Sequence, residues 1–135
     1  YPASTRRFGA RLGLARCLNA SGAAAEARRI LVRLTGETVG QLKSMAFLEL
    51  ARIEQKAGES EAALKHYLMV AILENDEKLA APALLGAAEC SLALGRRKEA
   101  LEHAAELVKR FPRSHLRRKA ERIIERLRRP ALRTP

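Results

Sequence analysis

Apolar residues recur along this chain at helical spacing, and the helical segments themselves recur with a fixed period. Three glycines, Gly22, Gly58 and Gly95, stand 36 and 37 residues apart. Apolar residues stand seven positions before each glycine and five, nine and twelve positions after it. These positions are Ala15, Ala51 and Ala88, then Ala27, Ala63 and Ala100, then Leu31, Tyr67 and Ala104, and finally Leu34, Val70 and Leu107. A period of this length indicates stacked helix pairs rather than one globular core.

The period and its punctuation predict seven helices. We expect them at about residues 5–20, 23–35, 40–57, 60–74, 79–94, 97–110 and 114–129. Each glycine should lie in the turn within a pair, where positive φ is useful. Pro82 should lie in the first turn of its helix, because a deeper position costs about 3 kcal/mol. Residues 75–78 should then form a turn or a short 3₁₀ segment. Since no segment alternates like a strand, the predicted fold is all-α.

A second repeated motif sets the outer boundaries of the array. Segment 1–4 reads YPAS, and segment 111–114 reads FPRS. Proline cannot continue the preceding helix, and serine can accept from the free N–H groups of the next one. No fourth glycine stands near position 132. We therefore predict one array over residues 1–135, with repeats at about 5–37, 40–75 and 78–112 and a capping helix at 114–129. It would be a piece of a longer protein that opens on the end of a further repeat.

The pattern of small and large residues around the three glycines resembles the tetratricopeptide repeat (TPR) family over nearly the whole chain. That family keeps small residues where the two helices of a unit cross, and large ones where neighbouring units interlock. The period here is two or three residues above the usual 34. The resemblance implies a right-handed α-solenoid of antiparallel helix pairs.

The resemblance also implies a concave groove lined by the first helix of each pair. The implied groove residues are Leu12, Arg16, Asn19, Leu48, Arg52, Gln55, Leu85, Glu89, Leu92, Arg122, Arg126 and Arg129. Leu12 and Leu85 stand where some relatives carry a lysine that holds a peptide's terminal carboxylate, so that clamp should be absent. A groove of leucine and arginine suits a partner segment with acidic groups and an apolar anchor. The alternative is structural: Glu89 pairs with neighbouring arginines inside the groove.

Charge is the feature most open to a functional interpretation. The formal net charge is +11, of which +7 falls in the last 23 residues. The expected basic patch of the last helix consists of Arg117, Arg118, Lys119, Arg128 and Arg129. Two interpretations stay open, namely a solvated face that keeps the array soluble and a surface for an acidic partner.

Catalytic, metal and cofactor chemistry finds no support in the sequence, so we expect no enzyme, no metal site and no cofactor. His66, His103 and His115 lack companions at metal-ligand spacing and should be solvated surface residues. Cys17 and Cys90 occupy equivalent positions two repeats apart. Helices packed at 8 to 10 Å place them beyond the roughly 7 Å that a disulfide spans. We expect two free, largely buried thiols.

The predicted function is a protein interaction scaffold that binds a partner segment along the concave groove. The YPAS and FPRS turns and the long period resemble those of bacterial envelope repeat proteins, and this resemblance implies a role in assembling or coordinating envelope machinery. The alternative is non-specific binding of nucleic acid or another polyanion through the basic last helix. Sequence-specific reading is disfavoured, because the groove repeats no aromatic residue. The chain has no run of 18 apolar residues and so no predicted membrane span. The bacterial cytoplasm and the periplasm both fit, and the oligomeric state is left open.

Overall fold

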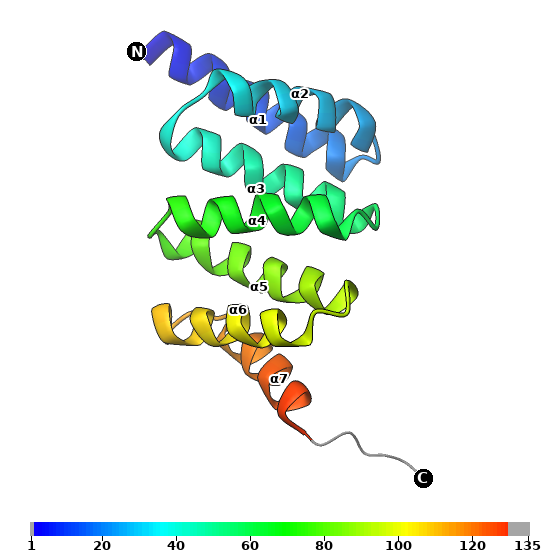
Figure 1. Ribbon diagram of the computed structural model, residues 1–135. Helices are drawn as coiled ribbons and strands as arrows, with labels where there is room; N and C mark the ends of the chain where they lie inside the picture. Colours follow the sequence, from blue (N-terminus) through cyan, green and yellow to red (C-terminus); the bar gives the residue numbers. More distant parts are fainter. Residues whose placement is uncertain (1, 130–135) are drawn as a thin grey trace.

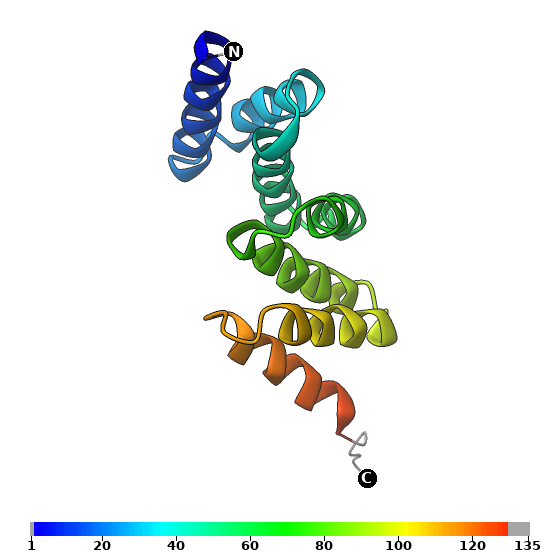
Figure 2. The ribbon, with the colours of Figure 1, turned by 90° about the vertical axis from the view of Figure 1, so that its left-hand side faces the viewer.

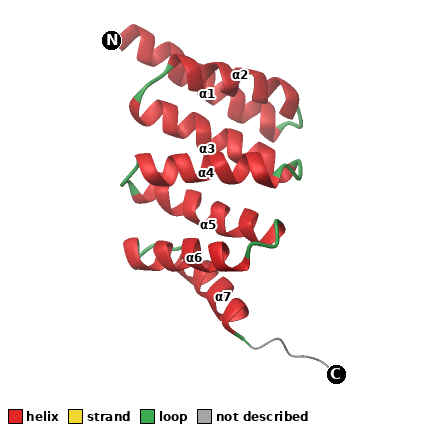
Figure 3. Ribbon diagram, viewed as in Figure 1, coloured by secondary structure: helices red, strands yellow, loops and turns green. Residues whose placement is uncertain are grey.

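The computed structural model describes residues 2–129, which form seven helices and no strand within that range (Figures 1 and 3). The helices are α1 (Pro2–Ala20), α2 (Ala24–Glu37), α3 (Gly40–Lys56), α4 (Ser60–Leu73), α5 (Glu77–Ala93), α6 (Arg97–Arg110) and α7 (Arg117–Arg128). Each helix packs against the next along the chain. The predicted all-α solenoid of seven helices is confirmed.

The odd-numbered and even-numbered helices form two different layers. Helix α3 contacts both α1 and α5, and α5 also contacts α7. The even-numbered helices make no close backbone contact with one another within residues 2–129. Successive pairs therefore stack along the array, as Figures 1 and 2 show. The odd-numbered layer, which we call the odd face, is the more closely packed side.

Alanine and leucine side chains fill the interior in two clusters that meet at α3. Ala46, Leu50 and Ile53 of α3 pack with α1 and α2, and Phe47 and Ala51 of the same helix pack with α4 and α5. All five side chains are at most 8 % exposed. The two faces of α3 thus join the first repeat to the rest of the array.

The turns within the pairs have the predicted glycine geometry. Gly22, Gly58 and Gly95 have φ of 94°, 82° and 76°. In each turn the residue after the glycine donates its N–H, at 2.8 Å, to the carbonyl five residues earlier. This pairing is the Schellman end of a helix, which needs a residue in the left-handed region. The same three-dimensional turn therefore closes all three pairs.

The start of α5 differs from the prediction. The helix begins at Glu77, because the Asp76 carboxylate caps it by accepting from the N–H of Lys78 at 3.0 Å. The prediction of a turn at residues 77 and 78 is wrong, and Pro82 lies in the second turn rather than the first. Its ring removes the bond that the carbonyl of Lys78 would accept. Lys78 is exposed, so water can replace that bond.

The two predicted proline turns behave differently. Segment 112–116 is a turn, and the Oγ of buried Ser114 accepts from the N–H of Leu116 at 3.1 Å. This bond lies within the turn, and the N-cap of the last helix is Leu116 without a side-chain cap, so the predicted capping role of the serine is wrong. The last helix consequently begins at Arg117 rather than at 114. Residues 2–4 belong to α1 and form no preceding turn, since proline is well suited to the first position of a helix. Tyr1 lies outside the described residues.

The cysteines are both free, but only one of them is buried. Cys90 is 1 % exposed, whereas Cys17 is exposed. The expectation of two buried thiols is wrong for Cys17, because no even-numbered helix among residues 2–129 packs on that side of α1, whereas α4 packs on α5 and Cys90 lies in the core cluster between them. No helix within residues 2–129 is long and apolar enough to cross a membrane.

Candidate functional site

A hollow of about 450 Å³ lies on the odd face, between α3, α5 and α7. We call it the odd-face groove. Four of the predicted groove residues line it, namely Arg52, Gln55, Leu85 and Glu89. The other lining residues are Tyr67, Pro82, Gly86, His115, Leu116 and Lys119. The structure therefore brings predicted residues from α3 and α5 together with side chains from α4, α7 and the turn before α7.

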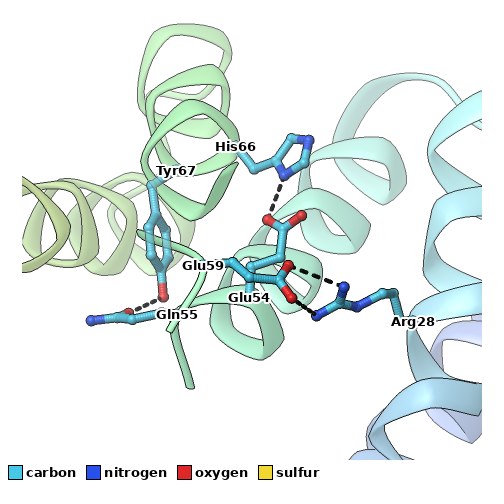
Figure 4. Close-up of polar contacts among 6 residues, drawn as sticks. All are labelled: Arg28, Glu54, Gln55, Glu59, His66 and Tyr67. Atoms are coloured by element: carbon cyan, nitrogen blue, oxygen red, sulfur yellow. Dashed lines mark hydrogen bonds and ion pairs between the residues drawn. The ribbon is translucent and has the colours of Figure 1, made fainter. Parts of the chain in front are cut away.

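Tyr67 reaches this groove from α4 by passing over Gly86 of α5. A Cβ on Gly86 would stand 2.4 Å from the tyrosine ring, so only glycine leaves room for it. The hydroxyl of Tyr67 donates to Oε1 of Gln55 at 2.7 Å (Figure 4). Gln55 in turn donates from Nε2 to Oε1 of Glu89 at 3.1 Å. A chain of two hydrogen bonds thus fixes the Glu89 carboxylate at the groove surface.

Burial determines the protonation of this tyrosine. Tyr67 is 3 % exposed. Loss of solvation raises the pKa of Tyr67 well above its ordinary value of 10.0, and the nearby Cys90 adds to the effect. A phenol is protonated at neutral pH in any case, and the raised pKa lets Tyr67 keep its proton and keep donating to Gln55 at alkaline pH as well.

Two of the predicted groove arginines, Arg52 in the odd-face groove and Arg16 outside it, contact Glu49, a residue that the sequence interpretation missed. Its Oε1 lies 2.7 Å from Nη1 of Arg52 and 3.6 Å from Nε of Arg16. The side chains of the two arginines remain 46 % and 47 % exposed. The arginines therefore pair with Glu49, and Glu89 accepts from Gln55 instead. The available signal was local, since Glu49 stands three residues before Arg52 on one helix face.

The remaining predicted groove residues lie elsewhere. Leu12 and Leu48 are 3 % and 4 % exposed and belong to the two core clusters, so they offer little surface. Asn19 lines a different hollow of about 490 Å³ at the turn between α1 and α2. Leu92 is half-buried on α5 and does not line the odd-face groove.

The basic residues of α7 divide between two surfaces. Lys119 faces the odd-face groove. Arg118, Arg122 and Arg128 line a separate hollow of about 510 Å³ together with Val108, Glu121, Ile124 and Glu125. Arg117 bonds to Glu121 at 2.9 Å and to the carbonyl of Pro112 at 3.0 Å. Arg126 and Arg129 are exposed and line neither hollow.

His66 is a structural residue rather than a solvated one, which corrects the expectation for this histidine. Its Nδ1 lies 2.6 Å from Oε1 of Glu54 (Figure 4). Its ring also stacks on Phe47, with the ring centroids 5.3 Å apart. Glu54 is only 7 % exposed, so the imidazole supplies the partner that a buried carboxylate needs. Figure 4 also shows the pair between Arg28 and Glu59, which links α2 to the start of α4.

The comparisons with known proteins identify one repeat. Residues 82–114, from Pro82 in α5 through α6 to Ser114, match the family model described as the tetratricopeptide repeat. No curated protein matches the chain significantly. Proteins built from this repeat are typically scaffolds for protein–protein interaction and not enzymes. This match and the seven helices packed in consecutive pairs are consistent with a TPR-like repeat protein.

Proposed function

We propose that this protein is an interaction scaffold whose odd-face groove binds a segment of a partner protein. The convergence of Arg52, Gln55, Leu85 and Glu89 around one hollow is the observation that supports the proposal. A volume of about 450 Å³ falls within the range of protein ligand sites. The hydrogen-bond chain from Tyr67 and the pairing of Arg52 with Glu49 fix polar groups in advance, which lowers the entropic cost of binding.

The groove chemistry favours a partner segment with a carboxylate and an apolar side chain. Arg52 and Lys119 supply cationic donors, and half-buried Leu116 supplies apolar surface beside them, to which Leu85 at 7 % exposure adds little. A guanidinium can bind a carboxylate through two parallel hydrogen bonds. The net charge of +11 also steers acidic segments toward the molecule. An acidic segment with one aliphatic anchor is therefore the expected ligand.

Selection from a displayed peptide library would test the groove directly. Peptides selected on the native protein should be acidic with an aliphatic residue. They should bind at least about tenfold more weakly to the double variant Arg52→Glu with Lys119→Glu, which corresponds to about 1.4 kcal/mol. Lys98→Glu on α6 makes the same kind of charge change outside the groove and should leave binding intact. Selected peptides that bind the double variant as well as the native protein would remove the groove proposal, provided that circular dichroism shows both variants folded.

A second candidate function is non-specific polyanion binding by the basic patch. Arg118, Lys119, Arg128 and Arg129 are all exposed. A salt titration with a generic RNA separates the two functions, because phosphate binding weakens steeply as salt rises. Binding below micromolar at physiological salt with a steep salt slope would favour the patch. The bacterial envelope role stays a prediction and rests on the FPRS turn and the long repeat period, because residues 2–4 form no turn.

A further inference from the structure

The hollow at the turn between α1 and α2 lies at the junction of the first and second repeats, inside the array. We call it the turn hollow. Its volume is about 490 Å³, and its walls include Ala24, Ala25, Arg28, Ile53, Lys56 and Ala57. Since α3 packs between α1 and α5, a further repeat before α1 would pack on the side of α1 that faces away from α3. The turn hollow is therefore bounded by the two repeats that form it.

Leucines pack at the corresponding place between the second and third repeats. Arg28 and Ala57 correspond to Leu64 and Leu94, which stand 36 and 37 residues further along. Leu64 is 5 % exposed, and Leu94 packs half-buried against the same core cluster. Ala57, in contrast, is exposed. The turn hollow thus lies where two leucine side chains pack at the next junction.

The difference between the two junctions lies in the side chains and not in the backbone. Ala57 has φ of −80° and ψ of 0°, and Leu94 has φ of −87° and ψ of 0°. Arg28 does not replace the leucine at its position, because both terminal nitrogens of its guanidinium bind Glu59, at 3.0 and 3.1 Å (Figure 4). An aliphatic side chain from outside the chain can therefore take the place that the leucines occupy at the next junction.

The charge around the turn hollow also differs from that of the next junction. Lys56 is exposed and forms no ion pair with another described residue, and its counterpart is Ala93. Ala25 stands where the next repeat carries Glu61, whose carboxylate pairs with Arg96 at 2.8 Å. The turn hollow thus has an ammonium at its rim and lacks the carboxylate of its counterpart, which favours an acidic group in the occupant.

We propose that the turn hollow binds a leucine-sized aliphatic side chain of a partner protein, on a segment that carries a carboxylate beside it. The side chain packs on Ala24, Ile53 and Ala57, and the carboxylate lies against Lys56. Burial of the aliphatic group supplies the affinity, and the ammonium selects acidic segments over basic ones. The turn hollow shares no lining residue with the odd-face groove, so the protein has two separate partner surfaces.

A matched set of peptides tests the turn hollow on the intact chain. The probe is a capped pentapeptide with the sequence glycine, glutamate, leucine, glutamate, glycine. One control peptide has alanine in place of the leucine, and the other has lysine in place of both glutamates. In nuclear magnetic resonance titrations, the leucine peptide should shift the amide signals of Ala24, Ala25 and Ala57. The alanine peptide should bind at least about tenfold more weakly, and the lysine peptide at least about threefold more weakly.

Two variants of the protein locate the binding site. Ala57→Leu introduces the residue that the next repeat carries at the same backbone conformation, and it should weaken binding of the leucine peptide by at least about tenfold. Circular dichroism should show its helicity unchanged. Lys56→Glu should weaken binding by about threefold or more. Lys98→Glu on α6 makes the same charge change away from the turn hollow and should leave binding unchanged.

The remaining outcomes separate this site from the odd-face groove and from self-association. The groove variant Arg52→Glu with Lys119→Glu should show the same shifts at Ala24, Ala25 and Ala57, so the result is independent of the groove proposal. Equal affinity for the leucine and alanine peptides, or binding that survives Ala57→Leu, would overturn the proposal. No saturable shift up to about 10 mM peptide would do the same. Sedimentation that shows a dimer dissolved by Ala57→Leu would replace the partner segment by a second copy.

Discussion

Helices α1 and α5 carry the same repeat pattern, but equivalent side chains are exposed on α1 and buried on α5. Cys17 and Cys90 stand at the same position of their repeats, yet only Cys90 is buried. Gly13 and Gly86 are likewise equivalent. A Cβ on Gly13 would meet nothing within 4 Å, whereas one on Gly86 would collide with Tyr67. The comparison teaches that a repeat position fixes the direction of a side chain, while the neighbouring helix decides whether that direction leads to solvent or to a packed interior.

Substitution of the two glycines by alanine should have the largest effect and tests this comparison directly. Gly86→Ala should destabilise the protein by about 3 kcal/mol, because the added methyl displaces the buried ring of Tyr67. Gly13→Ala should stabilise it by up to about 1 kcal/mol, since alanine is the better helix former and the space is open. Urea unfolding measures both. Changes of the same sign and size in the free energy of unfolding would mean that the two positions share one environment, contrary to the structure.

Arg110 and Glu37 end their helices at equivalent positions and sharpen the comparison further. Arg110 donates to the carbonyls of Ala71 and Glu74 at 3.1 and 3.0 Å, and so caps the end of α4. Arg110→Ala should therefore cost about 2 kcal/mol of unfolding free energy. Glu37 makes one surface ion pair with Arg11, and Glu37→Ala should cost less than about 1 kcal/mol. Thermal unfolding of the two variants side by side tests this, and equal losses would contradict the capping role.

The smallest expected effect is a loss of stability at alkaline pH that depends on Cys90 and not on Cys17. Burial raises the pKa of Cys90 from 9.0 to about 11, with the carboxylates of Glu89 and Glu54 adding to the shift. Between these values the unfolded chain loses a proton that the native state keeps, so stability falls as pH rises. The loss should reach about 1 kcal/mol by pH 10.

Two alanine variants isolate this contribution. Cys90→Ala should remove that part of the alkaline slope, and Cys17→Ala should leave it in place. Denaturant unfolding at pH 8, 9 and 10 provides the measurement. An unchanged slope in Cys90→Ala would show that the thiol is not shielded in the native state.

The parts of the fold that follow from local chemistry could be predicted from the sequence. A glycine at a fixed period requires a left-handed turn, and Gly22, Gly58 and Gly95 all adopt one. The start of α5 was missed because Asp76 is an effective cap and permits Pro82 a position one turn deeper than propensity suggests. Hydrophobic periodicity therefore predicts the last residue of a helix better than its first residue, because a capping side chain sets where a helix begins.

The candidate site was predictable only in part, for a different reason. The residues Arg52, Gln55, Leu85 and Glu89 share a face by their spacing, and they do line one hollow. The contact from Glu49 to Arg16 depends on side-chain reach between helices, whereas its pair with Arg52 lies within α3. The entry of Tyr67 depends on the missing Cβ of Gly86 in another repeat. Contacts of this kind are set by tertiary packing and leave no period in the sequence.

The odd-numbered helices contact one another at the backbone and the even-numbered helices do not, so the array should resist bending more strongly in one direction than in the other. Odd-numbered helices approach one another at the backbone across repeats and are tied by the link from Gln55 to Glu89. Within residues 2–129, even-numbered helices are joined across repeats by side chains alone, through the pairs Arg28–Glu59 and Arg96–Glu61 and the bonds from Arg110 to the end of α4. Bending that opens the even side would break these side-chain bonds before it separated the closely packed odd-numbered helices. Mechanical load is thus expected to change the outer surface before it alters the odd-face groove.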